Sequence, residues 1–329
     1  MKRYRKSLFF VVIMLAAVFG GCALKEYQKP VSETRLLLNT VCTITLYGAQ
    51  DKLLLTEALD LCEEYEAMFS MTSEGSDIWR VNHAEGNPVA VSPQTAEVIA
   101  AGLRFGNLSD GMFDITVGRL SALWDFSGNP SVPSALALAA ALETVDYRNV
   151  TLDGNTVRLA YPGAWVDLGG IAKGYIADRL AAFLKIRGAE GAVIDLGGNV
   201  YVVGEKPNGK PWRVGVRKPS GGSSGFVGTI ETGEASVVTS GIYERQFESD
   251  GVMYHHILDP TDGMPVKSDV VSATVVTESS MLGDVLSTLI VLLGSESVPA
   301  LLDSFPELHG AALVLDDGDL LQFGDIVME

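Results

Sequence analysis

Three oxygen-bearing side chains share one face of an apolar segment in the C-terminal part of the chain. The segment 279–293 reads SSMLGDVLSTLIVLL, and the spacing of its leucines and valines predicts a core helix. Asp284, Ser287 and Thr288 stand at i, i+3 and i+4, so they lie side by side on a helix. Hard oxygen donors grouped in this way suit Mg²⁺, which takes few protein ligands and adds water and phosphate oxygens. The alternative is an amphipathic helix with a modest polar stripe.

A glycine-rich turn supplies a second candidate, for an anion. Positions 166–180 read VDLGGIAKGYIADRL, in which a strand ends, Asp167 follows and two glycines lead into a helix. Glycines let a ligand approach the backbone, the N–H groups of a helix start attract anions, and Lys173 adds positive charge. A similar segment at 195–204, DLGGNVYVVG, is better interpreted as a β-turn, and an ordinary turn is also the alternative for the first segment.

Two histidines and an aromatic residue beside a carboxylate complete the candidates. His255 and His256 lie in YHHILDPTDG, and strand alternation predicts that they point to opposite faces, so at most one faces a given cleft. A neutral imidazole can take the proton of an attacking hydroxyl, although a histidine is usually structural. Phe113 and Asp114 follow a glycine turn and could line a pocket for a base, with core packing as the alternative for Phe113.

The elements expected around these residues are helices interleaved with many short strands. Helices are predicted at 53–69, 92–108, 134–143, 171–187, 279–293 and 296–303. Strands are predicted at 36–46, 150–152, 156–160, 192–195, 199–204, 212–217, 226–231, 236–239, 252–258 and 270–276, with a final pair joined by Asp317-Gly318. The lack of a regular βαβ rhythm predicts an α+β fold with mixed or antiparallel sheets. The Ser/Gly run 220–225 is expected to join two strands of one unit.

The N-terminal residues predict the compartment. Four basic residues within 1–6, an apolar run from Leu8 to Phe19 and the pair Gly20-Gly21 precede Cys22. This pattern predicts a lipoprotein signal peptide over 1–21, a lipidated Cys22 and a polar tether over 22–33. We therefore expect an extracytoplasmic chain that is lipid-anchored to the cell membrane. An ordinary signal peptide or an anchor helix is the alternative.

Composition narrows the possible partners. The formal net charge is −17 at pH 7, which argues against binding to nucleic acid or to an anionic lipid surface. Cys42 and Cys62 are the only cysteines besides Cys22, and both lie in apolar settings. They are interpreted as small buried hydrophobic residues, with a disulfide between them left open.

Eight segments taken together resemble the ApbE family, the FAD:protein FMN transferases. In chain order they are FSMTSEGSDIWRVN, SDGMFDITVGRLSALW, VDLGGIAKGYIAD, VIDLGGNVYVVG, PWRVGVRKP, VVTSGIYER, HHILDPTDGMPV and GDVLSTLIVLLG. The resemblance implies one α+β domain over 34–329, in which FAD lies in a cleft between two subdomains. The chain departs from many members at Leu38-Asn39-Thr40, where they have Met-Gly-Thr, and at Thr72, where they have an aromatic residue.

The resemblance also implies the site residues. FAD contacts are expected from Leu38, Met71, Thr72, Met112, Phe113, Asp114, Asp167, Lys173 and Ile257. Magnesium is expected on the backbone carbonyl of Gly170 and the side chains of Asp284 and Thr288, with Ser287 close by. His256 matches the catalytic histidine of the family.

The implied activity is a Mg²⁺-dependent cleavage of FAD. The FMN half passes to a Thr or Ser of a partner, an extracytoplasmic redox protein, and AMP is released. His256 is expected to deprotonate the acceptor hydroxyl. One alternative is a Mg²⁺-dependent FAD pyrophosphatase that uses water and gives FMN and AMP. The other is a non-catalytic flavin-binding or solute-binding lipoprotein, which needs neither His256 nor a metal.

Overall fold

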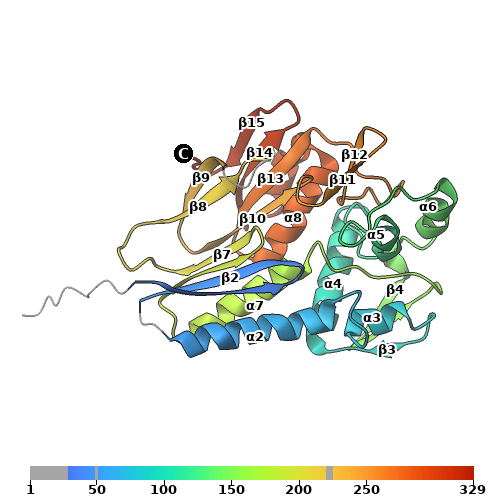
Figure 1. Ribbon diagram of the computed structural model, residues 1–329, viewed down its shortest axis with the longest axis horizontal. Coiled ribbons are helices and arrows are strands. Elements are labelled where there is room, and N and C mark those ends of the chain that lie inside the picture. The colour runs from blue at the N-terminus through green and yellow to red at the C-terminus, as the bar shows by residue number, and fades with distance from the viewer. Residues whose placement is uncertain (1–28, 49–50, 220–224) are drawn as a thin grey trace, which may run out of the picture.

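The computed structural model describes residues 29–48, 51–219 and 225–329. The expected signal peptide, Cys22 and most of the tether therefore lie outside the described residues, as do residues 220–224 of the Ser/Gly run. Figure 1 shows a large sheet with helices against it and a mainly helical part at one end of it. In the described part of the chain, no helix is both long and apolar enough to cross a membrane.

An eight-stranded antiparallel sheet forms the larger part of the molecule. Its order is β1-β2-β6-β7-β10-β13-β14-β15. The strands are β1 Val31–Leu37, β2 Thr40–Tyr47, β6 Gly191–Leu196, β7 Asn199–Gly204, β10 Ala235–Gly241, β13 Val270–Thr277, β14 Leu308–Leu315 and β15 Leu320–Gly324. β13 is buried along nearly its whole length, because it lies inside the sheet and both of its faces are covered.

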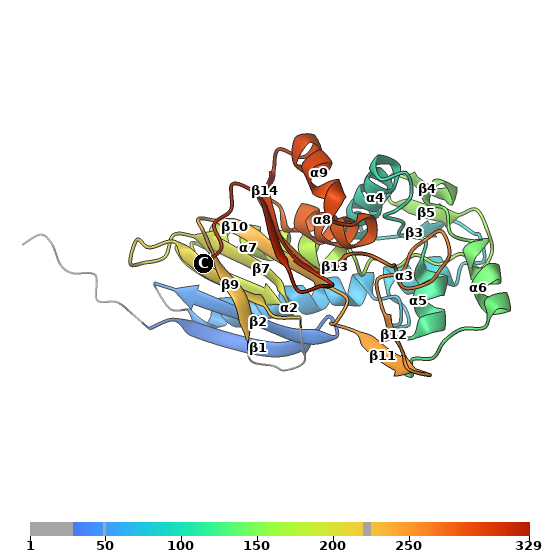
Figure 2. The ribbon, with the colours of Figure 1, turned by 90° about the horizontal axis from the view of Figure 1, so that it is seen from above.

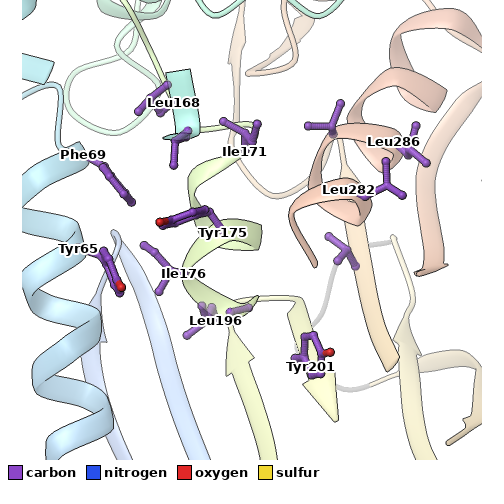
Figure 3. Packing of buried hydrophobic residues seen from close by; sticks show 14 of the residues in the cluster. Tyr65, Phe69, Leu168, Ile171, Tyr175, Ile176, Leu196, Tyr201, Leu282 and Leu286 are labelled. Atoms are coloured by element: carbon purple, nitrogen blue, oxygen red, sulfur yellow. The ribbon is translucent and has the colours of Figure 1, made fainter. Parts of the chain in front are cut away.

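Helices cover one face of this sheet. α2 (Lys52–Phe69) and α7 (Ala172–Ile186) pack beside each other, and α8 (Ser280–Leu293) packs on β10 and β13. Figure 3 shows the core between them, where Tyr65 and Phe69 of α2 meet Tyr175 of α7 with ring centroids 5.7–5.8 Å apart. The last helical elements are η2 (Ser295–Ser297) and α9 (Val298–Ser304).

The other face carries a separate hairpin made of β8 (Trp212–Arg217) and β9 (Phe226–Thr232). Val216 and Ile230 of the hairpin are buried in one cluster with Val237 of β10 and Val276 of β13. The two strands that flank the Ser/Gly run therefore pair with each other, as the sequence predicts.

The mainly helical part lies beyond one end of the sheet, as Figures 1 and 2 show from two directions. Its helical elements are α3 Asp77–Asn82, α4 Pro93–Leu108, α5 Gly118–Trp124, α6 Ala135–Leu142 and η1 Tyr147–Asn149. A small sheet in the order β3-β5-β4 belongs to it, with β3 Val89–Ala90, β4 Val150–Asp153 and β5 Thr156–Leu159. A second hairpin, β11 (Gln246–Ser249) with β12 (Val252–His255), reaches across to α5.

The α+β prediction is confirmed, and most predicted elements are present. Helix α4 begins as expected, with the Ser92 side chain accepting the Thr95 N–H and Pro93 in the first turn. The strand predicted at 252–258 is wrong in its second half, because β12 ends at His255 and a turn follows. The short elements α3, α5 and β11 were not predicted. Cys42 and Cys62 are both free and buried, which confirms their interpretation as small core residues.

Two helices start in direct contact and cap each other. In α7, the N–H of Gly174 donates to Oδ2 of Asp284 in α8 at 2.9 Å. In return, Asp178 of α7 accepts the N–H groups of Ser280 and Met281 at 2.7 and 3.0 Å. A Cβ at position 174 would lie only 2.6 Å from the Cα of Met281, so glycine is required for this approach.

Replacing this glycine should destabilise the fold. We expect Gly174→Ala to cost about 1–3 kcal/mol in the free energy of unfolding, because the added methyl group overpacks the contact between α7 and α8. The measurement is urea unfolding followed by circular dichroism. Gly233→Ala is the matched control, since a Cβ there has no neighbour within 4 Å. Equal midpoints for the two variants would contradict this account of the helix contact.

Candidate functional site

Asp284 is the best-defined residue of the site. Its side chain is buried, with 2% relative exposure. Oδ2 accepts the Gly174 N–H at 2.9 Å, and Oδ1 lies 3.6 Å from the Nζ of Lys173, which stands one residue earlier on α7. A buried carboxylate needs a cationic partner, and a single ammonium at this distance leaves room for a second cation. The predicted neighbourhood of Asp284 and Lys173 is therefore present.

Hydroxyl groups continue the polar face of α8. Thr288 Oγ1 and Ser287 Oγ both donate to the Asp284 carbonyl, at 3.0 and 3.2 Å. Ser240, at the end of β10, joins them: its Oγ is 2.8 Å from that of Ser287 and 3.2 Å from Thr288 Oγ1. Ser287 is fully buried and Thr288 is half-buried, so Thr288 is the more accessible oxygen. These are hard oxygen donors beside a carboxylate, and they fit the demands of Mg²⁺.

The turn from Asp167 to Gly170 adjoins the predicted aromatic wall. The backbone of Asp167 is held by Ile115, because the Ile115 carbonyl accepts the Asp167 N–H at 2.8 Å. The side chain of Asp167 closes the turn, with its Oδ1 accepting the Gly169 N–H at 2.8 Å. Gly170 lies against the Phe113 ring, since a Cβ there would be 3.2 Å from Phe113 Cε2. The two segments, more than fifty positions apart in the chain, are thus brought together.

Asp114 is engaged inside the fold. Its Oδ1 accepts the Thr116 N–H at 2.7 Å and the Thr116 hydroxyl at 2.6 Å, and its Oδ2 accepts the Tyr147 N–H at 2.9 Å. Burial raises the pKa of this carboxyl, while these hydrogen bonds act against the rise. Asp114 therefore fixes the loop that carries Phe113, and its predicted contact with FAD stays a prediction.

The other predicted FAD residues come from separate elements. Leu38 lies in the turn between β1 and β2, where its N–H donates to Glu66 of α2 at 2.9 Å. Met71 packs partly against the main core just after α2, and Met112 does so beside Phe113. Thr72 is exposed, and Ile257 is buried directly after His256. Their contacts with a ligand stay predictions.

The two histidines have different roles in the structure. The Nε2 of His255 lies 3.1 Å from the Val266 carbonyl, and its buried Nδ1 has no hydrogen-bond partner in the described part of the chain. His256 lies after the strand, and its Nδ1 is 3.3 Å from the Arg245 carbonyl. A carbonyl only accepts, so Nδ1 carries the hydrogen and Nε2 keeps its lone pair. Burial, and then the charges of Arg245 and Lys173, lower the pKa of His256 to about 3.

An aromatic cluster holds the hairpin that carries these histidines. Trp124, Phe126, Phe247 and Tyr254 have ring centroids 5.4–6.3 Å apart. The Trp124 indole also donates to the Gly263 carbonyl at 2.8 Å, beyond the histidine turn. The helical part of the molecule thereby positions His256 relative to the sheet.

Sequence reasoning missed a charged group that interacts with Lys173. Glu244 follows β10, and desolvation of its carboxyl by the surrounding protein raises its pKa. Lys173, Arg217 and Arg245 oppose that rise, and Asp284 adds to it, so all four charges act on Glu244. The signal was present in the segments VVTSGIYER and PWRVGVRKP, to whose charged residues no role was given.

Comparison with known proteins defines the class. The family model of the ApbE family matches residues 38–312. The chain therefore belongs to the ApbE family. This confirms the resemblance that the eight sequence segments indicate.

Individual relatives agree along most of the chain. The FAD:protein FMN transferase of Vibrio cholerae (serotype O1) is 37% identical over 299 residues, which cover 88% of both chains. That of Treponema pallidum (strain Nichols) is 33% identical and covers 90% of this chain and 88% of its own. The crystal structure of the ApbE protein of Thermotoga maritima has a TM-score of 0.82 at 33% identity and covers 90% of this chain and 97% of its own. The Vibrio cholerae flavin transferase ApbE has a TM-score of 0.79 at 32% identity, over 90% and 96% of the two chains.

Proposed function

We propose that this chain is an FAD:protein FMN transferase, which cleaves FAD, attaches FMN to a Thr or Ser of a partner protein and releases AMP. The relatives that carry this name support the proposal. The observation that carries it is one cluster of charges: Asp284 lies beside Lys173, and Lys173 also acts on His256, whose Nε2 keeps its lone pair. This supplies a site for a diphosphate together with a base.

A magnesium ion fits the oxygen donors of this cluster. Asp284 and Thr288 would hold it, with the carbonyl of Gly170 as a further donor and Ser287 orienting Thr288 through Ser240. When bound there, Mg²⁺ supplies neutralising charge next to the phosphate oxygens.

The residues of the chain itself bind the phosphates and move one proton. The Lys173 ammonium attracts and orients the diphosphate. His256 takes the proton of the acceptor hydroxyl on Nε2, while the Arg245 carbonyl holds its Nδ1–H. The acceptor oxygen forms a bond to the phosphorus on the FMN side, and the bond from that phosphorus to the bridging oxygen breaks. AMP leaves with this oxygen.

FAD hydrolysis is the second candidate activity, and Thr72 favours some of it. Thr72 is exposed, and it is small and polar where many family members have an aromatic residue. Such a side chain excludes less water from the flavin side. Water then competes with the protein hydroxyl, so we propose transfer as the main activity with some release of FMN and AMP beside it. A non-catalytic flavin-binding lipoprotein would instead bind FAD and never release AMP.

We also propose that the protein acts outside the cytoplasm, anchored through a lipidated Cys22, on an extracytoplasmic redox protein. The basic start, the apolar run and the Gly20-Gly21-Cys22 sequence support this location.

Removing the Asp284 charge should remove the metal. Asp284→Asn keeps an oxygen that can accept the Gly174 N–H, so the helix contact is retained. We expect the Kd for Mg²⁺ to rise about tenfold or more, roughly 1.4 kcal/mol, and Mg²⁺-dependent AMP release to fall with it. Isothermal titration calorimetry measures the first and chromatography the second. Asp303→Ala, exposed on α9, is the control. Unchanged Mg²⁺ affinity in Asp284→Asn would remove this residue from the metal site.

Truncating His256 should abolish transfer while FAD still binds. We expect His256→Ala to slow flavinylation by about 10²–10⁴-fold, the usual contribution of a general base. In-gel flavin fluorescence of the acceptor on a denaturing gel measures transfer, and equilibrium dialysis measures FAD binding. His309→Ala, exposed on β14, is the matched control. Flavinylation at the wild-type rate in His256→Ala would show that another group is the base.

The lipid anchor can be tested on the precursor. Cys22→Ser removes the thiol that would be acylated, so we expect an unprocessed, non-acylated protein in the membrane or soluble fraction. Mass spectrometry of the N-terminal peptide, beside the wild-type chain, makes the comparison. An acylated N-terminus in the variant, or none in the wild type, would contradict the assignment.

A further inference from the structure

A cavity of about 420 Å³ lies between the large sheet and the β8–β9 hairpin, on the face opposite the helices. Val193 of β6, Val200 of β7 and Val237 of β10 lie on its floor beside the polar Thr45, Asp195 and Thr239, and Val214 of β8 forms part of its roof. We call this cavity the hairpin groove. The residues proposed above for the metal and the phosphates do not line this cavity, although one of its ends lies near them.

The hairpin groove reaches the catalytic cluster at that end. Glu244 lines it, and so does Thr239 of β10; the next residue, Ser240, has its Oγ 3.2 Å from Oγ1 of Thr288 in the proposed metal site. Gly198 lies just below, since a Cβ there would be 3.5 Å from Glu244 Oε1. A chain segment lying in the groove would therefore end beside the diphosphate site, around the end of the sheet.

The length of the groove fits a short extended peptide. Along β7 the lining runs from Gly198, just before the strand, to Val202, five residues whose four steps span about 13 Å at about 3.3 Å each. An extended segment of similar length would place alternate side chains on the floor and under the hairpin. At the rim, Phe226 is 70% exposed, and its ring rests over Gly215, where a Cβ would be 2.6 Å from Phe226 Cε1. An exposed aromatic side chain of this kind is a typical anchor of a protein interface.

Charge favours an acidic occupant. The groove is lined by Lys206, Arg213 and Arg217 and by Asp195 and Glu244. Arg213 pairs with Glu231 and Glu329, and the charge of Arg217 acts on Glu244. Lys206 is therefore the cation of the lining that can meet an acidic side chain of a partner, and such a pair adds selectivity.

We propose that the hairpin groove receives an extended segment of the acceptor protein, with an acidic side chain at Lys206, and delivers its Thr or Ser hydroxyl past Glu244 to the phosphate site. The inference rests on the proposed transferase function and adds the place where the acceptor binds. Phe226 and Lys206 are then residues that determine acceptor binding and leave FAD chemistry alone.

Two substitutions at the groove separate acceptor binding from FAD chemistry. We expect Phe226→Ala and Lys206→Glu each to raise the KM for a purified acceptor domain, by about tenfold for Phe226→Ala. FAD affinity, and Mg²⁺-dependent AMP release without acceptor, should stay within about twofold of wild type. Leu136→Ala, 82% exposed on α6, and the exposed Lys52→Glu are the matched controls. Thermal melting confirms that each variant is folded.

Other outcomes would overturn the proposal. An unchanged acceptor KM in both folded variants would exclude the groove. Weaker FAD binding would mean that the groove holds part of FAD, and a wild-type dimer split by Phe226→Ala would mean that it is an interface between copies. Failure of the proposed function is distinct, because the wild type itself would then not flavinylate the acceptor.

Cross-linking supplies a positive readout. With p-benzoyl-phenylalanine in place of Val214, we expect light-induced linkage to the acceptor peptide that contains the modified Thr or Ser, identified by mass spectrometry. The same group in place of Leu136 should give none. Linkage at position 214 to FAD or to a second copy of this chain would contradict the inference.

Discussion

At the start of each of the two helices at the site, backbone N–H groups donate to a carboxylate of the other helix. Helix α7 has no side-chain cap of its own, so Asp284 of α8 supplies the acceptor for the Gly174 N–H. Asp178 of α7 does the same for the first N–H groups of α8. A helix N-terminus carries partial positive charge, so both carboxylates are held at favourable potential. This exchange is possible only because glycine at 174 lets the backbones approach.

The same exchange orients the candidate metal ligand. Oδ2 of Asp284 accepts the Gly174 N–H, and this hydrogen bond leaves Oδ1 pointing toward Lys173. His256 arrives from elsewhere, on a hairpin held by the aromatic cluster around Trp124. The site is thus assembled from two separately fixed bodies, the helix pair and the hairpin. Its geometry depends on the packing between the sheet and the helical part.

Sequence alone could predict those parts of the site that depend on residue spacing within a single helix. Asp284, Ser287 and Thr288 share a helix face by spacing, and the capping signal of α4 is local. It could not show that the partner of Asp284 is the backbone of Gly174, 110 positions away. The strand predicted at 252–258 was too long because β12 ends at His255, and the two histidines contact different carbonyls, those of Val266 and Arg245. The charge of Glu244 interacts with Lys173 of α7 only in the folded chain, so no local pattern could show it.

The local charges support the proposal that this acidic chain holds a diphosphate. At the site, the charges of Lys173, Arg217, Arg245 and Asp284 all act on Glu244, and these five groups have an excess of 3 − 2 = 1 positive charge. The Arg245 and Lys173 charges, together with burial, keep His256 neutral, since its protonation would add a further cation. A diphosphate and Mg²⁺ bring opposite charges of about two units each, so the pair leaves this balance unchanged, whereas either alone disturbs it. For the proposed function, the electrostatics therefore favour joint binding of metal and FAD, with His256 neutral and able to accept the proton.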